Sequence, residues 1–440
     1  MNVLLIGNGA REHAIAEAIT RSYHQPQLFA FMKSHNPGIA DLSAGYHLGS
    51  YADVSAICAK AKEWGINLAV IGPEDPLSHG VVDALQSMNI PAVGPTKSLS
   101  RLEISKSFTR NLLEKYAIPG NLRFHNFTSP VGLELFLDAL DGIVLKPDGL
   151  TGGKGVMVQG DHFATKEEAL SLAREILSKH DRLTVEEKID GEEFSLQCFS
   201  DGKTIIPTPP VQDHKRRFID DKGPNTGGMG SYSDHDHLLP FLKEKDIKDG
   251  LEITRKVAEA ILQETGEPYK GIMYGGFMAT RDGVKLLEYN ARLGDPEAMN
   301  ILPLLKSDFI DICQAIVDGA LHEINVEFER QATVCKYIVP RGYGLPEDHP
   351  ESLSTAAKIE IGDTGKTRLY YSSVDKKADG LYMTASRALG LVGIANTLSE
   401  AEKIAEKAVS VIGGPVDHRP DIGTAQLINK RMQNMKRIRG

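Results

Sequence analysis

The residues between 143 and 158 have the types and spacing expected of a phosphate-binding loop. Two short apolar runs, each suited to a strand, flank a glycine-rich loop that carries Lys154, and Lys146 lies near the end of the first run. The glycines of this loop are Gly149, Gly152, Gly153 and Gly155. Because glycine has no Cβ, consecutive backbone amides can approach an anion closely, and a neighbouring lysine makes a nucleotide phosphate the expected ligand. The alternative is an ordinary glycine-rich hairpin with a solvated lysine, and the loop alone does not decide between the two.

The loop differs from a P-loop. A P-loop has four residues between its first glycine and its Gly-Lys pair, and then a serine or threonine that holds magnesium. Here Gly149 stands one residue too close to Gly153-Lys154, and Gly155 follows the lysine. Strand-like runs on both sides also indicate a β-hairpin, so magnesium must be held elsewhere in the chain.

Glu288 and Asn290 supply such a metal site. They lie two residues apart in a run that reads as a strand, so their side chains point to the same face. Two oxygen donors on a rigid strand suit Mg²⁺, which completes its shell with water and phosphate oxygens. A half-exposed edge strand also contains such residues, and only the phosphate loop favours the metal.

Arg292 begins the run Arg-Leu-Gly-Asp-Pro-Glu directly after the candidate metal site. A guanidinium group binds a carboxylate or an oxyanion through two parallel hydrogen bonds, so Arg292 is a candidate to hold a substrate carboxylate or a reacting oxyanion. A structural salt bridge from Arg292 to Asp295 or Glu297 is the alternative.

Two further polar segments lie between these motifs. In the acidic turn 186–193, the backbone of Lys188 and Ile189 could face an adenine edge and Glu193 could accept from ribose hydroxyls, although by itself the segment reads as a charged turn. The basic cluster 213–217 precedes a second glycine-rich loop, 223–230. In an acidic protein such a pairing indicates an anionic ligand more than a solvated face.

The first strand is followed by Gly7-Asn-Gly-Ala-Arg-Glu-His13, which resembles a dinucleotide fingerprint without completing it. The third glycine is replaced by Glu12, and no acidic residue closes the second strand. With Arg11 and His13 present, a mononucleotide or a sugar phosphate at the helix N-terminus is more plausible than NAD. A tight turn without a ligand is the remaining alternative.

The elements that must position these residues follow from hydrophobic periodicity. The first hundred residues alternate strand and helix, which predicts a doubly wound parallel sheet with its ligands at the carboxyl ends of the strands. We expect domain boundaries near 103 and 330, strands from 143 to about 240, short strands after 333 and a basic C-terminal tail. The expected helices are 11–21, 54–64, 80–87, 96–116, 243–265, 303–318 and 398–412, and a hairpin joins strands 271–280 and 283–290.

Composition narrows the class of protein. The 440 residues carry a net charge of −9, which argues against a nucleic-acid-binding surface. No apolar run is long enough to cross a membrane, and the N-terminus lacks the features of a signal peptide. Four dispersed cysteines fit neither a disulfide framework nor a zinc site, so we expect a cytoplasmic protein.

Taken in order along the chain, the motifs resemble the phosphoribosylamine–glycine ligase family of the ATP-grasp superfamily. They are GNGAREH at 7–13, GPED at 72–75, KPDGLTGGKGV at 146–156, EEKIDGEE at 186–193, QDHKR at 212–216, GPNTGGMG at 223–230 and EYNARLGDPE at 288–297. The resemblance spans nearly the whole chain. The pair QDHKR and GPNTGGMG is specific to that family rather than to ATP-grasp proteins at large.

The resemblance implies a fold of mixed α/β and α+β type. It has an N-terminal doubly wound parallel sheet (1–103), a two-lobed ATP-grasp domain (104–328, with a flap subdomain at about 122–190) and a small β-rich C-terminal domain (329–440). It also implies an ATP-dependent, ADP-forming ligase of purine biosynthesis that uses Mg²⁺ or Mn²⁺. Glycine, activated as glycyl phosphate, would be joined to 5-phosphoribosylamine, with the glycine-rich loop as a lid. We expect small-molecule substrates, no nucleic-acid or membrane partner, and a monomer.

The resemblance also assigns residues. It places Lys106, Lys146 and Lys154 on the ATP phosphates, together with Gly152, Gly153 and Gly155. It places Glu186, Glu187, Lys188, Ile189 and Glu193 around the nucleoside, and the metal on Glu288 and Asn290. Glycine and the transferred phosphoryl group would lie against Asp213, Lys215, Asn225, Thr226, Gly227, Gly228, Met229, Gly230, Arg292 and Asp295. The phosphoribosyl group would lie against Asn8, Gly9, Arg11 and Glu74, and the catalytic residues would be Arg292, Lys154 and Asp213.

The chain departs from the family pattern at a few places, and alternatives remain. Pro147, Gly152-Gly153, Leu293 and Ala385-Ser-Arg387 differ from the residues common in the family, but none removes a charged contact. Another ATP-grasp carboxylate–amine ligase or a carboxylase is the nearest alternative. An NAD-dependent oxidoreductase and a non-catalytic nucleotide sensor are more distant ones.

Overall fold

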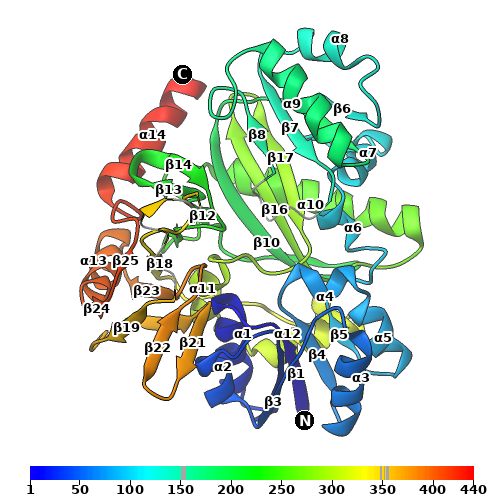
Figure 1. Cartoon of the computed structure of the whole chain (residues 1–440). Coiled ribbons are helices and arrows are strands. Elements are labelled where there is room, and N and C mark those ends of the chain that lie inside the picture. The colour runs from blue at the N-terminus through cyan, green and yellow to red at the C-terminus, as the bar shows by residue number, and fades with distance from the viewer. Residues whose placement is uncertain (150–154, 347–348, 351, 353–355) are drawn as a thin grey trace.

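The computed structural model describes residues 1–149, 155–346, 349–350, 352 and 356–440. The predicted phosphate-binding residues Gly152, Gly153 and Lys154 lie outside the described residues. Figure 1 shows an N-terminal domain, two central lobes and a C-terminal domain arranged around a common centre. In the described part of the chain no helix is long and apolar enough to span a membrane.

The N-terminal domain is built on a parallel sheet with the strand order β3-β2-β1-β4-β5. Its central strand β1 is buried on both faces, as its continuous apolar run predicts. The strands are β1 (Asn2–Ile6), β2 (Gln27–Met32), β3 (Gly45–Leu48), β4 (Leu68–Ile71) and β5 (Ala92–Val93). The helices are α1 (Ala10–Thr20), α2 (Pro37–Leu42), α3 (Val54–Glu63), α4 (Glu74–Ser78) and α5 (Val81–Ser87). The expected doubly wound sheet is confirmed, whereas β3, α2 and α4 were not foreseen.

The helix predicted at 96–116 is two shorter helices. They are α6 (Arg101–Ile104) and α7 (Lys106–Lys115). Ser105 between them has extended backbone angles, and its hydroxyl caps α7 by accepting from the Phe108 amide at 3.1 Å. A serine favours such a cap because its side chain satisfies an amide that the helix leaves free. The break places Lys106 at the start of α7.

The small lobe carries an antiparallel sheet in the order β6-β9-β7-β8. The strands are β6 (Phe124–Phe127), β7 (Ile143–Pro147), β8 (Met157–Val158) and β9 (Leu183–Glu187), and the helices are α8 (Leu133–Asp138) and α9 (Lys166–Lys179). Helix α9 lies in a region where we expected mainly strands. Its start is marked by a capping box between Thr165 and Glu168 that the sequence carries and the prediction overlooked.

The large lobe carries an antiparallel sheet in the order β11-β10-β16-β17. The strands are β10 (Glu192–Asp201), β11 (Ile205–Pro207), β16 (Lys270–Thr280) and β17 (Gly283–Asn290). The predicted hairpin between β16 and β17 and the predicted long helix are both present. The helices are α10 (Glu244–Thr265), α11 (Ala298–Ile301) and α12 (Phe309–Asp318), with the 3₁₀ turns η2 (Leu302–Leu304) and η3 (Leu321–Glu323). The helix expected at 303–318 therefore begins only at Phe309.

A third sheet continues from the central region into the C-terminal domain in the order β12-β15-β18-β23-β20, with β25 also paired to β18. Its strands are β12 (Gln212–Asp213), β15 (Gly230–Ser233), β18 (Ala332–Pro340), β20 (Arg368–Tyr371), β23 (Leu389–Ala395) and β25 (Val416–Asp417). Beside it lie the hairpin of β13 (Arg216–Phe218), η1 (Ile219–Asp221) and β14 (Lys222–Asn225). A further sheet, β21-β22-β19-β24, has the strands β19 (Lys358–Ile361), β21 (Val374–Lys377), β22 (Gly380–Met383) and β24 (Ile412–Gly413).

Two helices complete the C-terminal domain. They are α13 (Leu398–Val409) and α14 (Ala425–Arg439). Helix α14 takes the place of the basic tail that we expected, and Thr424 caps it by accepting from the Leu427 amide at 3.3 Å. Figure 1 shows α14 beside the hairpin β13–β14, at the edge of the central lobes.

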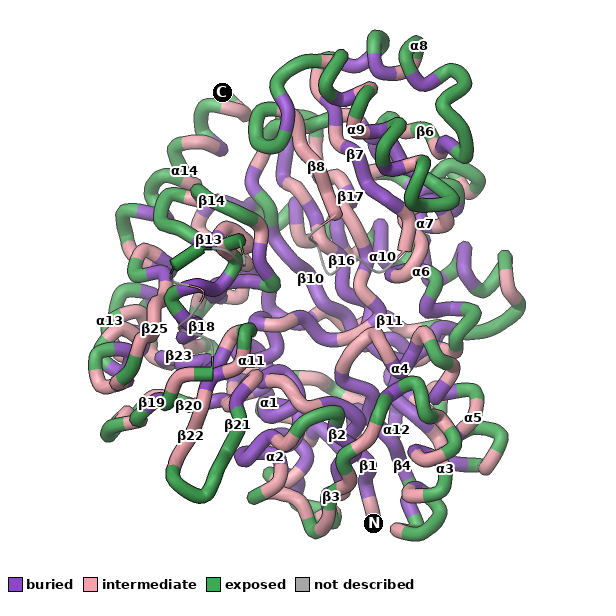
Figure 2. The backbone as a smooth tube through the Cα atoms, viewed as in Figure 1, coloured by how far each residue is buried: buried purple, intermediate pink, exposed green. Residues whose placement is uncertain are grey.

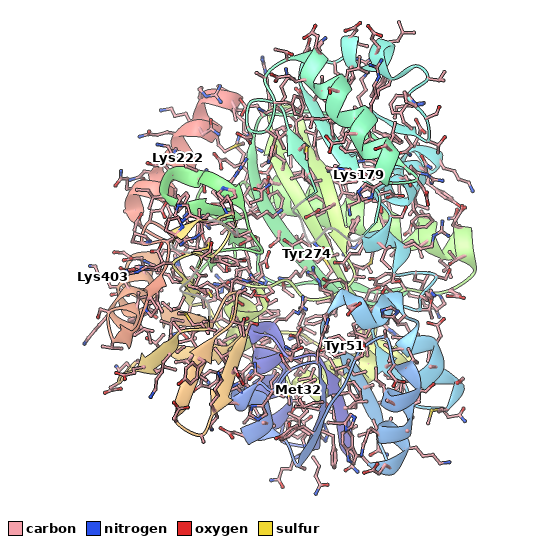
Figure 3. The ribbon with its side chains drawn as sticks, in the orientation of Figure 1. Met32, Tyr51, Lys179, Lys222, Tyr274 and Lys403 are labelled. Carbon is pink, nitrogen blue, oxygen red and sulfur yellow. The ribbon has the colours of Figure 1, made fainter. Side chains whose placement is uncertain are left out.

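The buried apolar side chains form separate cores of unequal size. One continuous core runs through the N-terminal domain, the large lobe and part of the C-terminal domain. The small lobe has a separate core that includes Phe127, Leu145 and Val185. Figure 2 shows buried strands such as β10 at the centre and exposed loops at the periphery of the small lobe. Figure 3 places Tyr274 near the centre of the molecule, between the lobe that carries Lys179 and the domain that carries Met32 and Tyr51.

Candidate active site

The lobes enclose a cavity of about 750 Å³ that collects most of the predicted residues. Its walls come from the N-terminal domain, both central lobes and the C-terminal domain. The predicted residues that line it are Arg11, Glu74, Lys106, Lys146, Glu186, Glu187, Lys188, Ile189, Glu193, Asp213, Lys215, Asn225, Thr226, Gly227, Glu288, Asn290, Arg292 and Asp295. Residues as far apart in the chain as Arg11 and Asp295 thus meet at one place.

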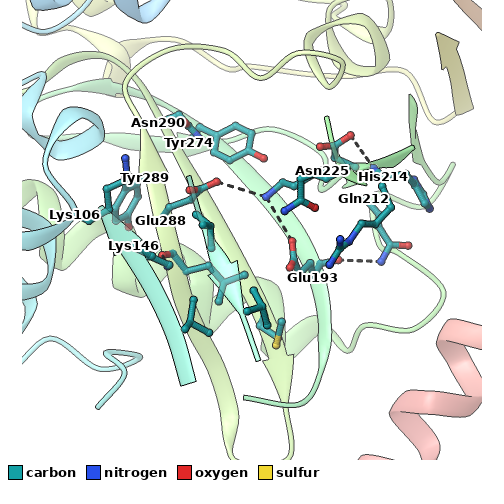
Figure 4. Close-up of a pocket in the computed structure, with 18 of the residues that line it drawn as sticks. Lys106, Lys146, Glu193, Gln212, His214, Asn225, Tyr274, Glu288, Tyr289 and Asn290 are labelled. Carbon is teal, nitrogen blue, oxygen red and sulfur yellow. Dashed lines mark hydrogen bonds and ion pairs between the residues drawn. The ribbon is translucent and has the colours of Figure 1, made fainter. Parts of the chain in front are cut away.

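Glu288 and Asn290 lie at the end of β17, and both face the cavity (Figure 4). Burial opposes ionisation of Glu288, but the positive charges of Lys215, Lys146 and Lys106 outweigh it and lower its pKa to about 2. Asn290 turns its side-chain oxygen toward Arg292, whose guanidinium donates to it at 3.3 Å. An ionised carboxylate and an amide oxygen on one face are the donor set that Mg²⁺ accepts, so these residues fit a divalent metal.

Lys215 bridges two carboxylates across the cavity. Its Nζ lies 3.6 Å from Glu193 and 3.5 Å from Glu288, as the dashed lines in Figure 4 show. The negative charge of Glu193 is the main reason why the pKa of Lys215 is raised, against the opposing effect of burial. The lysine is therefore a permanent cation beside the candidate metal site.

A buried ion network forms the small-lobe wall. The Glu186 carboxylate accepts from Arg110 at 2.6 Å and lies 2.8 Å from Lys146 Nζ, which also donates to the Leu287 carbonyl at 3.0 Å. Burial alone would raise the pKa of Glu186, but Arg110 and Lys146 lower it. The Glu186 side chain is thus engaged by protein cations and holds Lys146 in place.

In the turn after β9, only some of the backbone groups that we expected to face an adenine edge are available. The Lys188 amide donates to the Gly142 carbonyl at 2.8 Å, so it is not free for a ligand. Among the described residues no hydrogen bond engages the Lys188 carbonyl or the Ile189 amide. A donor–acceptor pair therefore remains, but it consists of the carbonyl of Lys188 and the amide of Ile189.

Arg292 is held by two glutamates. Its guanidinium lies 3.1 Å from Glu74 and 3.0 Å from Glu103. Burial raises the pKa of Glu103 to about 7, although Arg292 opposes this. Burial also acts on Glu74, but Arg292 and Arg11 outweigh it and lower the pKa of that group to about 2. The alternative of a bridge to Asp295 or Glu297 is wrong, because Glu74 and the unforeseen Glu103 occupy the guanidinium.

Asp213 lies in an acidic corner of the cavity. Burial, followed by the negative charge of Glu297, raises its pKa well above the usual range of a carboxylic acid. Glu297 accepts from the Tyr274 hydroxyl at 2.6 Å. Nearby, Arg387 donates to Asp295 at 3.0 Å and to the Gly228 carbonyl at 3.2 Å. Arg387, from the C-terminal domain, thus fixes the second glycine-rich loop.

Several predicted residues do not face the cavity. Met229 is fully buried and packs in the main core, since side chains of adjacent residues in an extended segment point in opposite directions. Gly228 has a positive φ of 107°, and a Cβ there would lie 2.7 Å from an Asp213 oxygen. At Gly230 a Cβ would lie 2.3 Å from the Cys335 carbonyl oxygen. These glycines allow close packing, and Gly155 likewise does not line the cavity.

The polar groups at the start of α1 are already hydrogen-bonded within the protein. The Gly9 amide donates to Glu12 at 2.6 Å, and Asn8 is bonded to Ser34 at 2.9 Å. His13 is not an anion-binding residue, because burial lowers its pKa to about 4 and its ring accepts from the Tyr371 amide at 3.0 Å. Arg11 alone of this turn lines the cavity.

The sequence reasoning missed several residues of the cavity. They are Glu103, Arg110, Glu297, Arg387, Arg431 and Asn434. Glu297 and Arg387 lie in motifs that we had noted without assigning them a role. Nothing local marks Arg110, Arg431 or Asn434, since they reach the cavity only through the tertiary fold.

Comparison with known proteins accounts for this architecture. Models of phosphoribosylglycinamide synthetase match the chain in order: the N domain at residues 1–103, the ATP-grasp (A) domain at 104–298 and the C domain at 333–425. The chain belongs to the phosphoribosylglycinamide synthetase family. The match of the C domain ends where α14 begins.

Relatives named phosphoribosylamine–glycine ligase match this family member along its whole length. The protein of Methanocaldococcus jannaschii is 48% identical, and that of Methanococcoides burtonii is 47% identical; each alignment covers 100% of both chains. The crystal structure of the Thermotoga maritima ligase has a TM-score of 0.79 at 26% identity and covers 96% of this chain and 100% of its own. A biotin carboxylase domain of Hydrogenobacter thermophilus has a TM-score of 0.71 at 15% identity, covering 99% and 93% respectively, which shows a shared fold alone.

Proposed function

We propose that this chain is a phosphoribosylamine–glycine ligase. It joins glycine to 5-phosphoribosylamine and converts ATP to ADP and phosphate. The observation that carries this proposal is the single cavity in which lysines from the small lobe, a metal-compatible pair on β17 and arginines facing the N-terminal domain meet. The full-length similarity to ligases of this name supports it.

The nucleotide lies between the two lobes. Lys106 and Lys146 face its phosphates, together with Lys154 and its neighbouring glycines in the loop. The Lys188 carbonyl and the Ile189 amide face the adenine edge, and Glu193 the ribose. Such a site catalyses phosphoryl transfer mainly by position and charge, because proton transfer contributes little to that step.

A divalent metal, Mg²⁺ or Mn²⁺, is held by Glu288 and Asn290. When bound, it neutralises charge on the phosphate oxygens. Because the pKa of Glu288 is about 2, this carboxylate is ready to coordinate without first losing a proton. Lys215 occupies the adjacent position and balances the same carboxylate.

Glycine and the transferred phosphoryl group lie near Asp213, Lys215 and Arg292. A glycine carboxylate oxygen attacks the γ-phosphorus while the bond to the β-phosphate oxygen breaks, which releases ADP. The nitrogen of phosphoribosylamine then attacks the acyl carbon of glycyl phosphate, and the bond to the phosphate oxygen breaks. A closed cavity protects this acyl phosphate from water.

The phosphoribosyl group lies toward the N-terminal domain, near Arg11 and Glu74. Arg11 supplies the positive charge that a sugar phosphate requires. Asn8 and Gly9 complete this wall only if ligand binding frees the groups that they now use within the protein.

The decisive experiment measures ADP release with purified enzyme, Mg²⁺, glycine and freshly made phosphoribosylamine. ADP must form only when all components are present, and the amide product must be identified by mass. Release of ADP with another acid or with bicarbonate, but not with glycine, would assign the chain to a different ATP-grasp activity.

A further inference from the structure

Helix α14, at the C-terminal end of the chain, contributes side chains to the cavity wall. Arg431 and Asn434 line the cavity wall beside Glu192, the first residue of β10. All but the first residue of this helix lies beyond the family-model match. The family model therefore does not account for the contacts that α14 makes at the cavity.

The two side chains hold one buried carboxylate. The Asn434 amide donates to Glu192 Oε1 at 2.7 Å, and Arg431 Nη1 lies 3.4 Å from Glu192 Oε2. The Glu192 side chain is only 6% exposed, so it depends on these partners to remain in a polar environment. Each carboxylate oxygen is thus engaged by a different residue of α14.

Arg431 also connects the neighbouring hairpin. Its Nη2 donates to Asp221, which lies in the η1 turn between β13 and β14. At the end of the helix, Arg439 pairs with Asp246 at 2.7 and 2.9 Å, and donates to the Thr280 carbonyl at 3.2 Å. Helix α14 therefore fixes the start of β10 and the end of β16, which are adjacent strands in one sheet.

Unpaired groups remain at the same wall. Arg431 Nε and His214 Nε2 are buried without a hydrogen-bond partner among the described residues, and both residues line the cavity. Burial and the charge of Arg431 lower the pKa of His214 to about 3, so the ring is neutral. Its Nδ1 lies 3.3 Å from the Gly230 carbonyl and must donate there, which leaves Nε2 as an acceptor. A free donor and a free acceptor in the same wall suit hydroxyl groups or water molecules.

We propose that α14 completes the nucleotide site, with Arg431 and Asn434 as positioning residues for ATP. They act through Glu192, because Glu193, the ribose-facing residue of the proposed function, follows it directly in β10. Fixing the Glu192 carboxylate fixes the backbone that presents Glu193 and the adjoining turn at 188–191. This inference rests on the proposed position of the nucleotide.

The test uses full-length Arg431→Gln and Asn434→Leu, each similar in size to the original residue. Both should raise the KM for ATP by about tenfold, the loss expected for a hydrogen bond to a charged group, while kcat and the KM for glycine stay within about twofold. Arg431→Lys keeps the charge but lacks Nε, and its KM for ATP should be intermediate. The control is Lys430→Gln on the same helix, whose partner Asp220 is equally exposed and does not line the cavity, and which should behave as wild type.

Calorimetric binding of a non-hydrolysable ATP analogue with Mg²⁺ separates the possible failures, because it requires neither glycine nor the amine. If both variants bind the analogue as tightly as wild type and only melt at a lower temperature, α14 is a structural brace and the inference is overturned. If wild type binds the analogue more tightly than the variants but forms no ADP with glycine, the inference stands and the proposed acid substrate is wrong.

Discussion

Arg292 Nε donates to a Glu74 carboxylate oxygen at 3.1 Å, although the two residues are separated by 218 positions in the chain. The contact joins the end of β17 to the start of α4 and therefore links the proposed metal site to the N-terminal domain. Glu103 pairs with the same guanidinium at 3.0 Å. The Arg292 guanidinium, which follows β17, is thus oriented by Glu74 and Glu103, and both of these acids lie outside the sheet of β17.

Replacing Glu74 by Gln tests this link. The variant loses the charge that orients Arg292 toward the N-terminal domain, so we expect kcat/KM for phosphoribosylamine to fall by about 10- to 100-fold. The KM for ATP should change little, because the proposed nucleotide site lies between the two central lobes. Steady-state kinetics with each substrate varied in turn provides the measurement. An equal loss for ATP and amine would argue against a specific role at the phosphoribosyl wall.

Replacing Glu288 by Gln tests the metal site. The change removes the anionic metal ligand with little change in size, so turnover should fall by about 100-fold or more at saturating Mg²⁺. The loss of folding stability should be much smaller than the loss of turnover, although the change also removes the ion pair with Lys215 at 3.5 Å. Wild-type turnover in this variant at high Mg²⁺ would remove Glu288 from the metal site. Gln at Glu252, an exposed acid of α10, serves as the control.

Replacing Glu186 by Gln breaks the buried network of the small lobe. Arg110 and Lys146 then share a site without their anion, and leaving buried charges unpaired costs about 3–5 kcal/mol. We expect faster hydrogen exchange in the strands of the small lobe, which has its own core, together with weaker ATP binding. Glu175→Gln, at an exposed helical pair, should leave exchange unchanged. Unaltered protection in β7 and β9 would show that the network contributes little.

Replacing Glu406 by Gln should change how stability depends on pH. Burial opposes ionisation of Glu406, but hydrogen bonds from His418 and Lys336 lower its pKa from 4.5 to about 2 in the folded protein. Below pH 4.5 the unfolded chain binds a proton at this residue, while the folded protein does not until the pH approaches about 2. The carboxylate therefore stabilises the protein above pH 4.5, and this contribution is lost progressively as the pH falls.

The measurement compares urea midpoints of wild type and Glu406→Gln from neutral pH down to the lowest pH at which both remain folded. The difference should be largest near neutrality and should shrink below pH 4.5. A difference that does not vary with pH would mean that the ionisation of Glu406 is not linked to folding.

Elements with strong local signals could be predicted from the sequence. The buried strand β1, the hairpin β16–β17 and helix α10 follow from apolar periodicity and turn residues. That Glu288 and Asn290 share a face could be predicted because a strand fixes the direction of residues two positions apart. Helix α14 could not be recognised so easily, because five of its fifteen residues are basic and only Leu427, Ile428 and Met435 are buried.

The limits of the site prediction also have physical causes. From the sequence, the Glu186 carboxylate was predicted to contact the nucleotide. Its actual partners, Arg110 and Lys146, come from other elements. His13 seemed suited to an anion until burial showed that its ring is neutral. Charge, spacing and residue type identify which segments face a site, while burial decides which atoms within them remain available.

The pairing of β15 with β18 has a consequence for how this protein can be divided. Every residue of β15 and of β18 is buried, and the four residues of β15 pair with residues 333–336 of β18. A fragment that ended near residue 330 would expose the edge of β15, and the remainder would expose β18. Neither piece is an independent folding unit, although the sequence suggests a boundary there. Produced together, the two halves should reassemble into an active heterodimer, which makes this junction a natural position for a split-enzyme reporter.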